Sequence, residues 1–214
     1  MSLFTGRIGP AVYEFLGKMS EKEFAPHRRA VIGQARGRVL EIGAGTGFNL
    51  AYYPPEVEEI VVTEPSRGMI ERAERRAAEL GRSVQIVEAA AERLPFEDAS
   101  FDTVVSTLVL CSVEDQGRAL AEIRRVLKPG GRLLFIEHVR SDDPRLARWQ
   151  DRLERPWGVI GMGCHPNRAT LEQIEAGGFE VEELERGKLP KSPPLVRPMI
   201  SGRALRVSEA DVGE

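Results

Sequence analysis

A short apolar run that ends in three alternating glycines limits what this chain can fold into more than any other feature. Residues 39–47 read Val-Leu-Glu-Ile-Gly-Ala-Gly-Thr-Gly, so a predicted strand is followed at once by Gly43, Gly45 and Gly47. Glycines at a turn from a strand to a helix let the backbone adopt positive φ angles, and they leave room for a ligand against the main chain. The segment therefore predicts an α/β protein that binds a nucleoside at this turn.

The spacing of these glycines distinguishes between two kinds of ligand. The dinucleotide-binding fingerprint places its third glycine three residues after the second, whereas this chain has Phe48 at that position and a glycine at 47. The register that holds a pyrophosphate is therefore broken, which disfavours a nicotinamide or flavin cofactor. S-adenosylmethionine has no phosphate, and its sulfonium cation tolerates the nearby Glu41. This methyl donor is the favoured ligand, and a nicotinamide or flavin site and a purely structural turn are the alternatives.

Strand-like apolar runs alternate with helical periodicity along the chain, which indicates a mostly parallel sheet with helices on both faces. The 214 residues, 42% of them hydrophobic, suffice for one α/β core and are too few for two ordinary domains. Helices are expected before Gly81, before the Lys128-Pro129-Gly130-Gly131 turn, and over about residues 168–176. The expected strands are 39–42, 60–63, 84–87, 101–106, 133–136, 179–184 and 201–207.

Two segments lie outside this alternation. A leading helix carries an apolar stripe, which predicts that it packs on something beyond the sheet; the stripe consists of Val12, Phe15, Leu16 and Met19. Residues 141–167 form a long insertion that contains both tryptophans, and insertions of this length usually form a lid or a binding loop. We therefore predict a helical cover over residues 1–36, a catalytic domain over 37–207 with its lid at 141–167, and a disordered tail over 208–214.

The net charge and the cysteine content limit which binding partners and which cellular compartment we expect. The net charge of −3 offers no support for a nucleic-acid or membrane partner, so a small molecule is the expected partner. Cys111 and Cys164 lie far apart without metal-ligand spacing, and we expect no metal site. No segment resembles a signal peptide, and no apolar run approaches the roughly 20 residues of a spanning helix. We therefore predict a cytoplasmic protein with reduced cysteines. The sequence does not indicate its oligomeric state.

An acidic residue at the end of the second strand strengthens the nucleoside prediction. Glu64 lies 19 residues after Gly45, close to the spacing at which an acidic side chain accepts hydrogen bonds from ribose hydroxyls. The segment 89–96 follows the third strand, where an adenine edge would meet backbone amides. Its three alanines permit close approach, although an alanine run is also common where a helix starts.

These motifs together resemble the class I S-adenosylmethionine-dependent methyltransferases, particularly the small-molecule branch that includes the quinone C-methyltransferases. The resemblance covers about residues 37–140, and it rests on Val39 to Gly47, Glu64, Leu94-Pro95-Phe96 with Ser100-Phe101-Asp102, and Leu127 to Gly131. It implies a Rossmann-like sheet of seven strands whose last strand is antiparallel. The donor would lie over the carboxyl ends of strands 1 and 2, with acceptor chemistry near strands 4 and 5.

A narrower set of motifs is similar to the alkyl thiol methyltransferases known in animals. These motifs reach almost the end of the predicted fold, and they are Thr107 to Val113, Glu137-His138-Val139, Gly163-Cys164 and Leu195 to Pro198. Those animal proteins resemble membrane-anchored proteins with an apolar leader, whereas this chain opens with Met1 to Gly6. We therefore do not expect their location to transfer.

The resemblance implies a donor-binding set around the glycine loop and the ends of the following strands: Glu41, Gly43, Ala44, Gly45, Thr46, Gly47, Asn49, Glu64, Pro65, Ser66, Met69, Ala90, Ala91, Glu92, Thr107 and Leu108. One position departs from the family pattern. Many relatives carry an aspartate after strand 3 that accepts from the adenine amino group, and Ala90 stands there instead. That contact would come from the backbone, from Glu92 or from water.

The acceptor side is expected beside strand 5 and the insertion. His138 ends strand 5 and is the candidate catalytic base, with a role in merely holding the lid as the alternative. Cys111, Cys164 and His165 are candidate acceptor contacts. Trp157 either contacts the acceptor or anchors the lid to the core.

Methyl transfer is an in-line displacement at a carbon already activated by the sulfonium, so the protein mainly has to align the acceptor and exclude water. A thiol with a pKa near 8.5 is partly ionised at neutral pH and needs little activation. The sequence therefore predicts an S-adenosylmethionine-dependent methyltransferase that acts on a small apolar thiol. The alternatives are C- or O-methylation of a quinol or phenol, and a donor-binding regulator without catalysis.

Overall fold

The computed structural model describes residues 8–161, 163–189 and 191–207. The helices in these ranges are α1 (Ile8–Ile32), α2 (Arg67–Glu79), α3 (Gln116–Val126), α4 (Pro144–Ile160) and α5 (Thr170–Ala176), with short 3-10 helices η1 (Phe48–Ala51) and η2 (Pro194–Val196). The strands are β1 (Arg38–Ile42), β2 (Glu59–Thr63), β3 (Gln85–Val87), β4 (Phe101–Thr107), β5 (Leu127–His138), β6 (Phe179–Lys188) and β7 (Pro198–Arg206).

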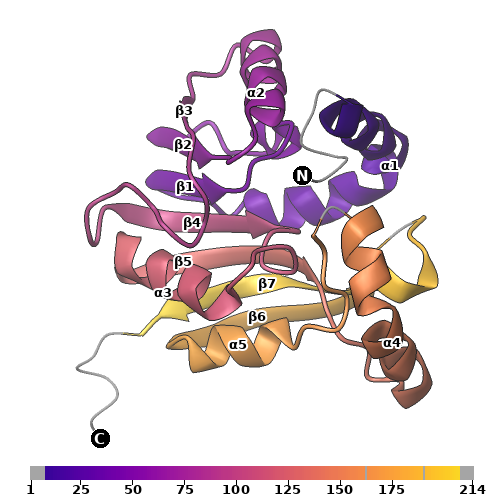
Figure 1. The fold of residues 1–214 in the computed structure, drawn as a ribbon. Helices are drawn as coiled ribbons and strands as arrows, with labels where there is room; N and C mark the ends of the chain where they lie inside the picture. The colour runs from indigo at the N-terminus through magenta and orange to yellow at the C-terminus, as the bar shows by residue number, and fades with distance from the viewer. Residues whose placement is uncertain (1–7, 162, 190, 208–214) are drawn as a thin grey trace, which may run out of the picture.

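All seven strands belong to one sheet, in the order β3-β2-β1-β4-β5-β7-β6 (Figure 1). The neighbours from β3 to β5 pair in parallel, and β7 runs antiparallel to both β5 and β6. The predicted α/β fold is confirmed, including the antiparallel last strand. The order reverses direction at β1, which places β1 and β4 side by side at the crevice where ligands of such sheets bind.

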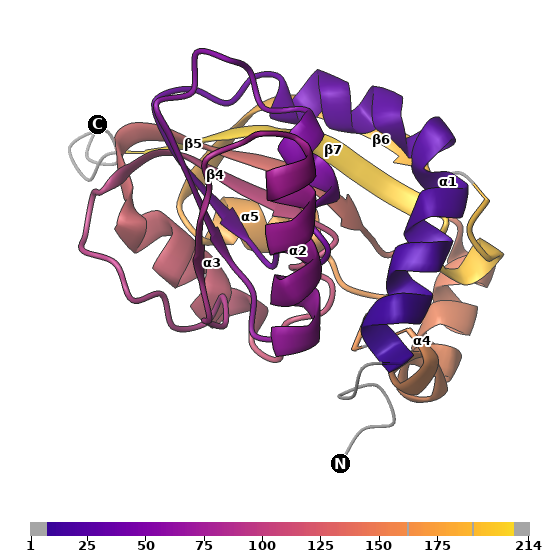
Figure 2. The same cartoon turned by 90° about the horizontal axis from the view of Figure 1, so that it is seen from above.

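Hydrophobic cores cover both faces of the sheet, and Figure 2 shows α1 and α3 on opposite sides of it. Neighbouring residues of the central strands point to opposite cores. Val39 packs with residues of α1 and α2, whereas Leu40 packs with residues of α3 and α5. In β4, Val105 belongs to the same core as Val39, and Val104 belongs to the same core as Leu40. Because both faces are buried, these strands are apolar at consecutive positions rather than at alternate ones.

Two helices flank the carboxyl ends of the parallel strands. Figure 1 shows α1 and α4 on the right, the side toward which the parallel strands run. The helix α4 begins with Asp143, whose side chain accepts a hydrogen bond from the N–H of Arg145, and Pro144 follows at the first helical position. Much of the 141–167 segment is therefore helical rather than an irregular loop, which differs from the loop or lid expected from the sequence.

The edges of several elements differ from the predicted ones. The helix α3 ends at Val126, as expected before the Pro-Gly turn. The strand β5 already starts at Leu127, because the chain stays beside β4 through the turn. Phe101 pairs with Leu127 and Thr103 pairs with Arg132, so the pairing register shifts between these two positions. This bulge contains Gly130 at φ +75°. β6 and β7 are longer than predicted, since they pair along their whole length.

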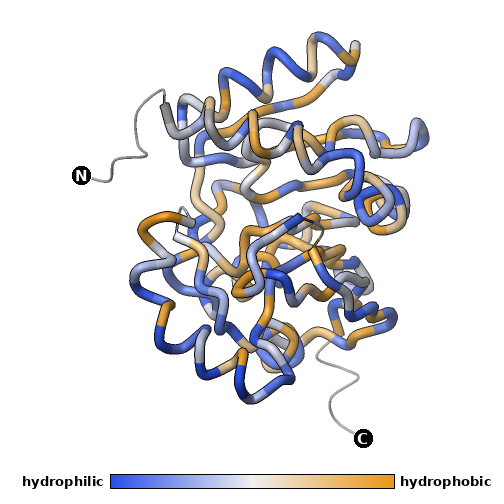
Figure 3. Tube along the Cα trace, turned by 90° about the vertical axis from the view of Figure 1, so that its right-hand side faces the viewer, coloured by the Kyte–Doolittle hydropathy of each residue, from blue (hydrophilic) through white to orange (hydrophobic). Residues whose placement is uncertain are grey.

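The apolar stripe of α1 faces solvent, which corrects the predicted packing. Phe15, Leu16 and Met19 are 64%, 57% and 59% exposed, and the side chain of Val12 lies outside the described residues. The helix packs through its other side, which carries Gly17 and the buried Phe24. Figure 3 shows that hydrophilic and hydrophobic stretches alternate along the outer helices. Among the residues that the structure describes, no helix is long and apolar enough to cross a membrane.

Candidate active site

The three glycines of the loop after β1 all adopt the left-handed conformation. Their φ angles are +56° at Gly43, +56° at Gly45 and +77° at Gly47. A Cβ at Gly43 would lie 2.7 Å from Cγ2 of Val109, and one at Gly47 would lie 3.0 Å from Cδ1 of Leu50. Both the backbone angles and the close neighbours therefore require glycine, which confirms the expected backbone conformation of this turn.

Glu64 connects the glycine loop to the start of α2. Its Oε2 accepts a hydrogen bond from the N–H of Gly45 at 2.9 Å, and its Oε1 accepts one from the N–H of Ser66 at 2.9 Å. Burial raises the pKa of the Glu64 carboxyl, and these two hydrogen bonds oppose that shift. An ionised carboxylate has about four acceptor positions, so both oxygens keep capacity for ligand hydroxyls. Met69 is buried in the first turn of α2, whereas Pro65 is exposed.

Glu41 supports the loop from within the protein. The hydroxyl of Tyr53 donates to one carboxylate oxygen at 2.6 Å, and the side-chain amide of Asn49 donates to the other at 2.8 Å. Burial raises the pKa of Glu41 to about 7, against the effect of these two donors. Both oxygens are thus engaged by protein groups. Asn49 also donates to Thr107 at 3.0 Å and accepts from the buried Arg28 of α1.

A buried hydroxyl in the loop has no partner within the described part of the chain. Thr46 is 1% exposed, and its Oγ1 makes no hydrogen bond to any described residue. Buried polar groups in folded proteins nearly always have a partner. A ligand that lies on the loop would supply one, so this orphaned hydroxyl, the glycine cradle and Glu64 fit a bound nucleoside. Ala44 is also buried at this turn, and its N–H donates to the carbonyl of Thr63.

The helix α1 packs directly on the glycine loop. The ring of Tyr13 lies 3.5 Å from where a Cβ of Gly45 would be, and a Cβ on Gly17 would lie 2.5 Å from the ring of Phe48. Glu14 forms ion pairs with Arg72 and Arg76 of α2 at 3.0 Å and 3.6 Å. The first half of α1 is thus held against both the loop and α2.

The loop after β3 contacts the loop after β4. The Oε1 of Glu92 accepts a hydrogen bond from the N–H of Glu114 at 2.8 Å, so this oxygen of the candidate adenine contact is engaged by protein. Ala91 is buried, whereas Ala90 is exposed. Leu108 follows β4 with a φ of +59°, a strained conformation for a residue with a side chain, and such strain clusters at functional sites.

Glu137 organises the turn after β4 from the neighbouring strand. Its Oε1 accepts hydrogen bonds from the hydroxyl of Ser106 at 2.7 Å and from the N–H groups of Val109 and Leu110, both at 3.1 Å. Its Oε2 accepts from the N–H of Cys111 at 3.1 Å. Burial raises the pKa of Glu137, and the four donors oppose that shift. The sequence showed this residue within a motif and indicated no role for it; an acidic residue inside an otherwise apolar strand was the available signal.

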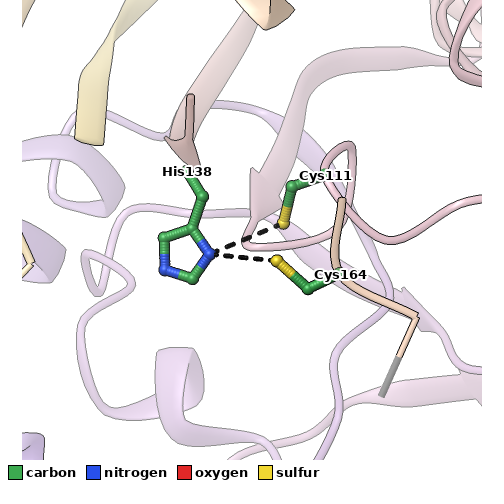
Figure 4. A group of neighbouring side chains, drawn as sticks. All are labelled: Cys111, His138 and Cys164. Carbon is green, nitrogen blue, oxygen red and sulfur yellow. Dashed lines mark hydrogen bonds between the residues drawn. The ribbon is translucent and has the colours of Figure 1, made fainter. Parts of the chain in front are cut away.

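Cys111, His138 and Cys164 meet at the carboxyl ends of β4 and β5 (Figure 4). Nδ1 of His138 lies 3.4 Å from Sγ of Cys164 and 4.0 Å from Sγ of Cys111, and all three side chains are buried. The neighbouring Cys164 thiol and burial hold the pKa of Cys111 well above its ordinary value, while the hydrogen bond with Cys111 lowers the pKa of Cys164. The fold thus brings together three potential metal ligands that are distant in sequence, which the spacing of the two cysteines did not indicate.

The insertion closes over this cluster. Trp157 of α4 packs against Cys111, Cys164 and Val196 together with Leu108. The N–H of His165 donates to the carbonyl of Cys111 at 2.7 Å, which ties the end of the insertion to the turn after β4. The ring of His165 instead pairs with Glu154 at 2.6 Å. Cys164 and Trp157 thus join the cluster, and the His165 side chain is directed to α4.

Comparisons with known proteins agree with this geometry. The family described as a methyltransferase domain matches residues 40–135. The solved structure of an S-adenosylmethionine-dependent methyltransferase from Thermotoga maritima covers 92% of this chain and 98% of its own, with 26% identity and a TM-score of 0.61. Thiol S-methyltransferase TMT1B of Rattus norvegicus is 39% identical over an aligned length of 173 residues, and the match covers 78% of this chain and 70% of that protein. Its Homo sapiens namesake is 33% identical over an aligned length of 210 residues, and the match covers 92% of this chain and 85% of that protein.

The glycine loop, the sheet order and these relatives define the class: the chain belongs to the class I S-adenosylmethionine-dependent methyltransferases. It is an enzyme of that class, and S-adenosylmethionine is its cofactor. Within the class, its similarity to the human thiol S-methyltransferase extends over 92% of the chain.

Proposed function

We propose that this protein methylates a small apolar thiol at sulfur. The observation that carries the proposal is the position of the buried cluster of Cys111, His138 and Cys164 next to the donor loop. A Cβ on Gly43 would touch Val109, so the donor loop packs against the same turn that presents Cys111. The surroundings of the cluster are apolar, with Val196, Leu108 and Trp157 around it. Such a site suits a small apolar acceptor.

For this reaction, the side chains mainly have to position the acceptor. When bound, S-adenosylmethionine supplies a methyl group that its sulfonium has already activated. Alignment of an acceptor with that carbon can account for roughly 7–11 kcal/mol of the barrier. His138 is the residue that we assign to loss of the acceptor proton, because it lies at the cluster and its buried Nε2 has no partner among the described residues. The products are a methyl thioether and the demethylated donor.

Two segments cover the site in this proposal, and residues 37–207 form the catalytic domain. The residues of α1 belong to the first cover, since Tyr13 lies on Gly45. The second cover is the insertion of residues 141–167, in which Trp157 rests on the cluster. Exclusion of water by such covers favours displacement over side reactions.

A methyl-transfer screen with isotopically labelled donor tests the proposal. The acceptors are short alkyl thiols, phenols, quinols and amines at matched concentrations, and the readout is the labelled product. We expect label on alkyl thiols. Label on quinols or phenols with none on thiols would replace the proposal by C- or O-methylation. Tight donor binding without transfer to any acceptor would support a regulatory role instead.

A further inference from the structure

We propose that Cys111, His138 and Cys164 form a zinc site with one open coordination position. Two sulfurs and one imidazole nitrogen are ligands that Zn²⁺ prefers, and two cysteines with one histidine are a known set for zinc sites that keep a position for a substrate. The ligand atoms all lie within 4.8 Å of one another. They come from three separate parts of the chain: the turn after β4, the end of β5 and the insertion (Figure 4).

The spacing of the three atoms matches tetrahedral zinc. Zinc bonds of 2.3 Å to sulfur and 2.0–2.1 Å to nitrogen put the nitrogen roughly 3.6 Å from each sulfur, and the sulfurs roughly 3.8 Å apart. The observed distances from Nδ1 of His138 are 3.4 Å to Cys164 and 4.0 Å to Cys111. Each sulfur thus lies within about 0.4 Å of the tetrahedral distance from the nitrogen, and the two sulfurs, which are at most 4.8 Å apart, would approach each other by at most about 1 Å. Figure 4 shows Nδ1 turned toward both sulfurs and the other ring nitrogen turned away.

The backbone around the cluster is already fixed. Glu137 accepts from the N–H of Cys111 at 3.1 Å, and the carbonyl of Cys111 accepts from the N–H of His165 at 2.7 Å. The N–H of Cys164 donates to the carbonyl of Gly161. The two cysteine-bearing segments are thus joined to each other before any metal arrives. Such outer contacts orient ligands and raise metal affinity.

The charges around the cluster suit a divalent cation. Two cysteine thiolates and Zn²⁺ sum to zero. The guanidinium of Arg168 donates to the carbonyls of Leu110 and Val113, both at 2.6 Å, and its positive charge interacts through space with the carboxylate of Glu137. No carboxylate belongs to the ligand set, which disfavours the hard cations Mg²⁺ and Ca²⁺, since these take oxygen ligands.

The open position would take the acceptor sulfur, and this step rests on the proposed function. A thiol that coordinates zinc loses its proton at neutral pH, and the proton passes to solvent. The resulting thiolate forms a new bond to the methyl carbon as the bond from that carbon to the sulfonium sulfur breaks. The thioether product has no charge on its sulfur and binds zinc weakly, so it leaves. His138 then promotes proton loss as a zinc ligand rather than as a free base.

Metal binding itself is the first test, and it needs no activity. The reduced, chelator-treated full-length chain is titrated with Zn²⁺ against a coloured chelator, and separately with Co²⁺ for absorption bands of thiolate coordination. We expect one equivalent, with the affinity lowered more than tenfold in Cys111→Ser, Cys164→Ser and His138→Ala. His27→Ala is the matched control and should bind as the parent does. Donor binding by calorimetry shows that each variant is folded.

Two outcomes overturn the zinc site. One is a parent chain that takes up no stoichiometric zinc while its thiols are reduced. The other is a folded Cys111→Ser or Cys164→Ser variant that keeps the parent affinity. A change in the Co²⁺ spectrum on addition of an alkyl thiol supports the open position, whether or not that thiol is methylated. Equal rates of thiol methylation by the zinc-free and zinc-loaded chains would overturn the role of the metal and leave the proposed function standing.

Discussion

The carboxylate of Glu64 accepts a hydrogen bond from the backbone N–H of Gly45 at 2.9 Å. The end of β2 thereby holds the middle of the loop that follows β1. The shape of the donor loop therefore depends on a side chain from the neighbouring strand.

Glu64→Ala should weaken binding of S-adenosylmethionine by about 1–3 kcal/mol, because ligand hydroxyls and the Gly45 N–H lose their acceptor. Calorimetry on the purified chain measures the effect. Glu59→Ala is the control, since Glu59 is an exposed acid at the other end of the same strand. Equal donor affinity in the two variants would contradict the role of Glu64.

Gly45→Val should abolish donor binding, since a branched residue is strained at a φ of +56° and its side chain would enter the ligand space beside Tyr13. Gly81→Val is a matched control, because Gly81 has a φ of +62° and nothing lies within 4 Å of its Cβ position. Both variants should lose stability in thermal unfolding. A Gly45→Val chain that binds the donor like Gly81→Val would remove the loop from the donor site.

Residues 8–32 and 141–161 should gain protection from hydrogen exchange when the donor or its product binds, because both segments close on the site. The experiment compares peptides from these ranges with and without ligand. Peptides from α5 serve as the internal control, since that helix packs on the opposite face. Identical protection in both states would mean that the two segments are a fixed cap.

The free energy of unfolding should depend on pH through Glu41. Its pKa is raised to about 7 in the folded chain, so its contribution is fully present below its unfolded pKa near 4.5 and is lost as the pH rises through about 7. Chemical denaturation at pH 5 and at pH 7.5 should show a loss of at most about 3 kcal/mol from this group. Glu41→Gln, which keeps an acceptor for Tyr53, should show a flatter profile. Parallel profiles would contradict the assignment.

His138→Ala should reduce thiol methylation most at low pH, where the free thiolate is scarce, and the deficit should shrink as the pH approaches the thiol pKa near 8.5. The profile of kcat/KM against pH measures this, with His27→Ala as the control. A deficit that is constant over pH would assign His138 to holding the lid.

Local features were predictable from the sequence, and contacts between distant segments were not. The loop from Gly43 to Gly47 carries its constraint in its own backbone, so its conformation followed from residue type alone. The stripe of Phe15, Leu16 and Met19 has the period of a buried face, yet Gly17 and Phe24 form the face that packs. Periodicity shows that a helix is amphipathic, but it does not show which of its faces packs against the rest of the protein.

The acceptor side was harder to predict for the same reason. Cys111 and Cys164 are separated by the helices α3 and α4 and the strand β5, so no spacing rule connects them. Their meeting depends on Glu137, which shapes the turn after β4, and on the helix α4, whose start signal at Asp143 and Pro144 was present in the sequence. The motif with Glu137 and His138 indicated that the acceptor side lies near the end of β5. The positions of the three side chains relative to one another could be known only from the folded structure.

The close packing of Gly43 on Val109 joins two parts of the molecule. The glycine loop is held by β1, β2 and α1, whereas the cluster of Cys111, His138 and Cys164 comes from the turn after β4, the end of β5 and the insertion. Val109 limits how closely the two parts approach each other, since its Cγ2 would lie only 2.7 Å from a Cβ on Gly43.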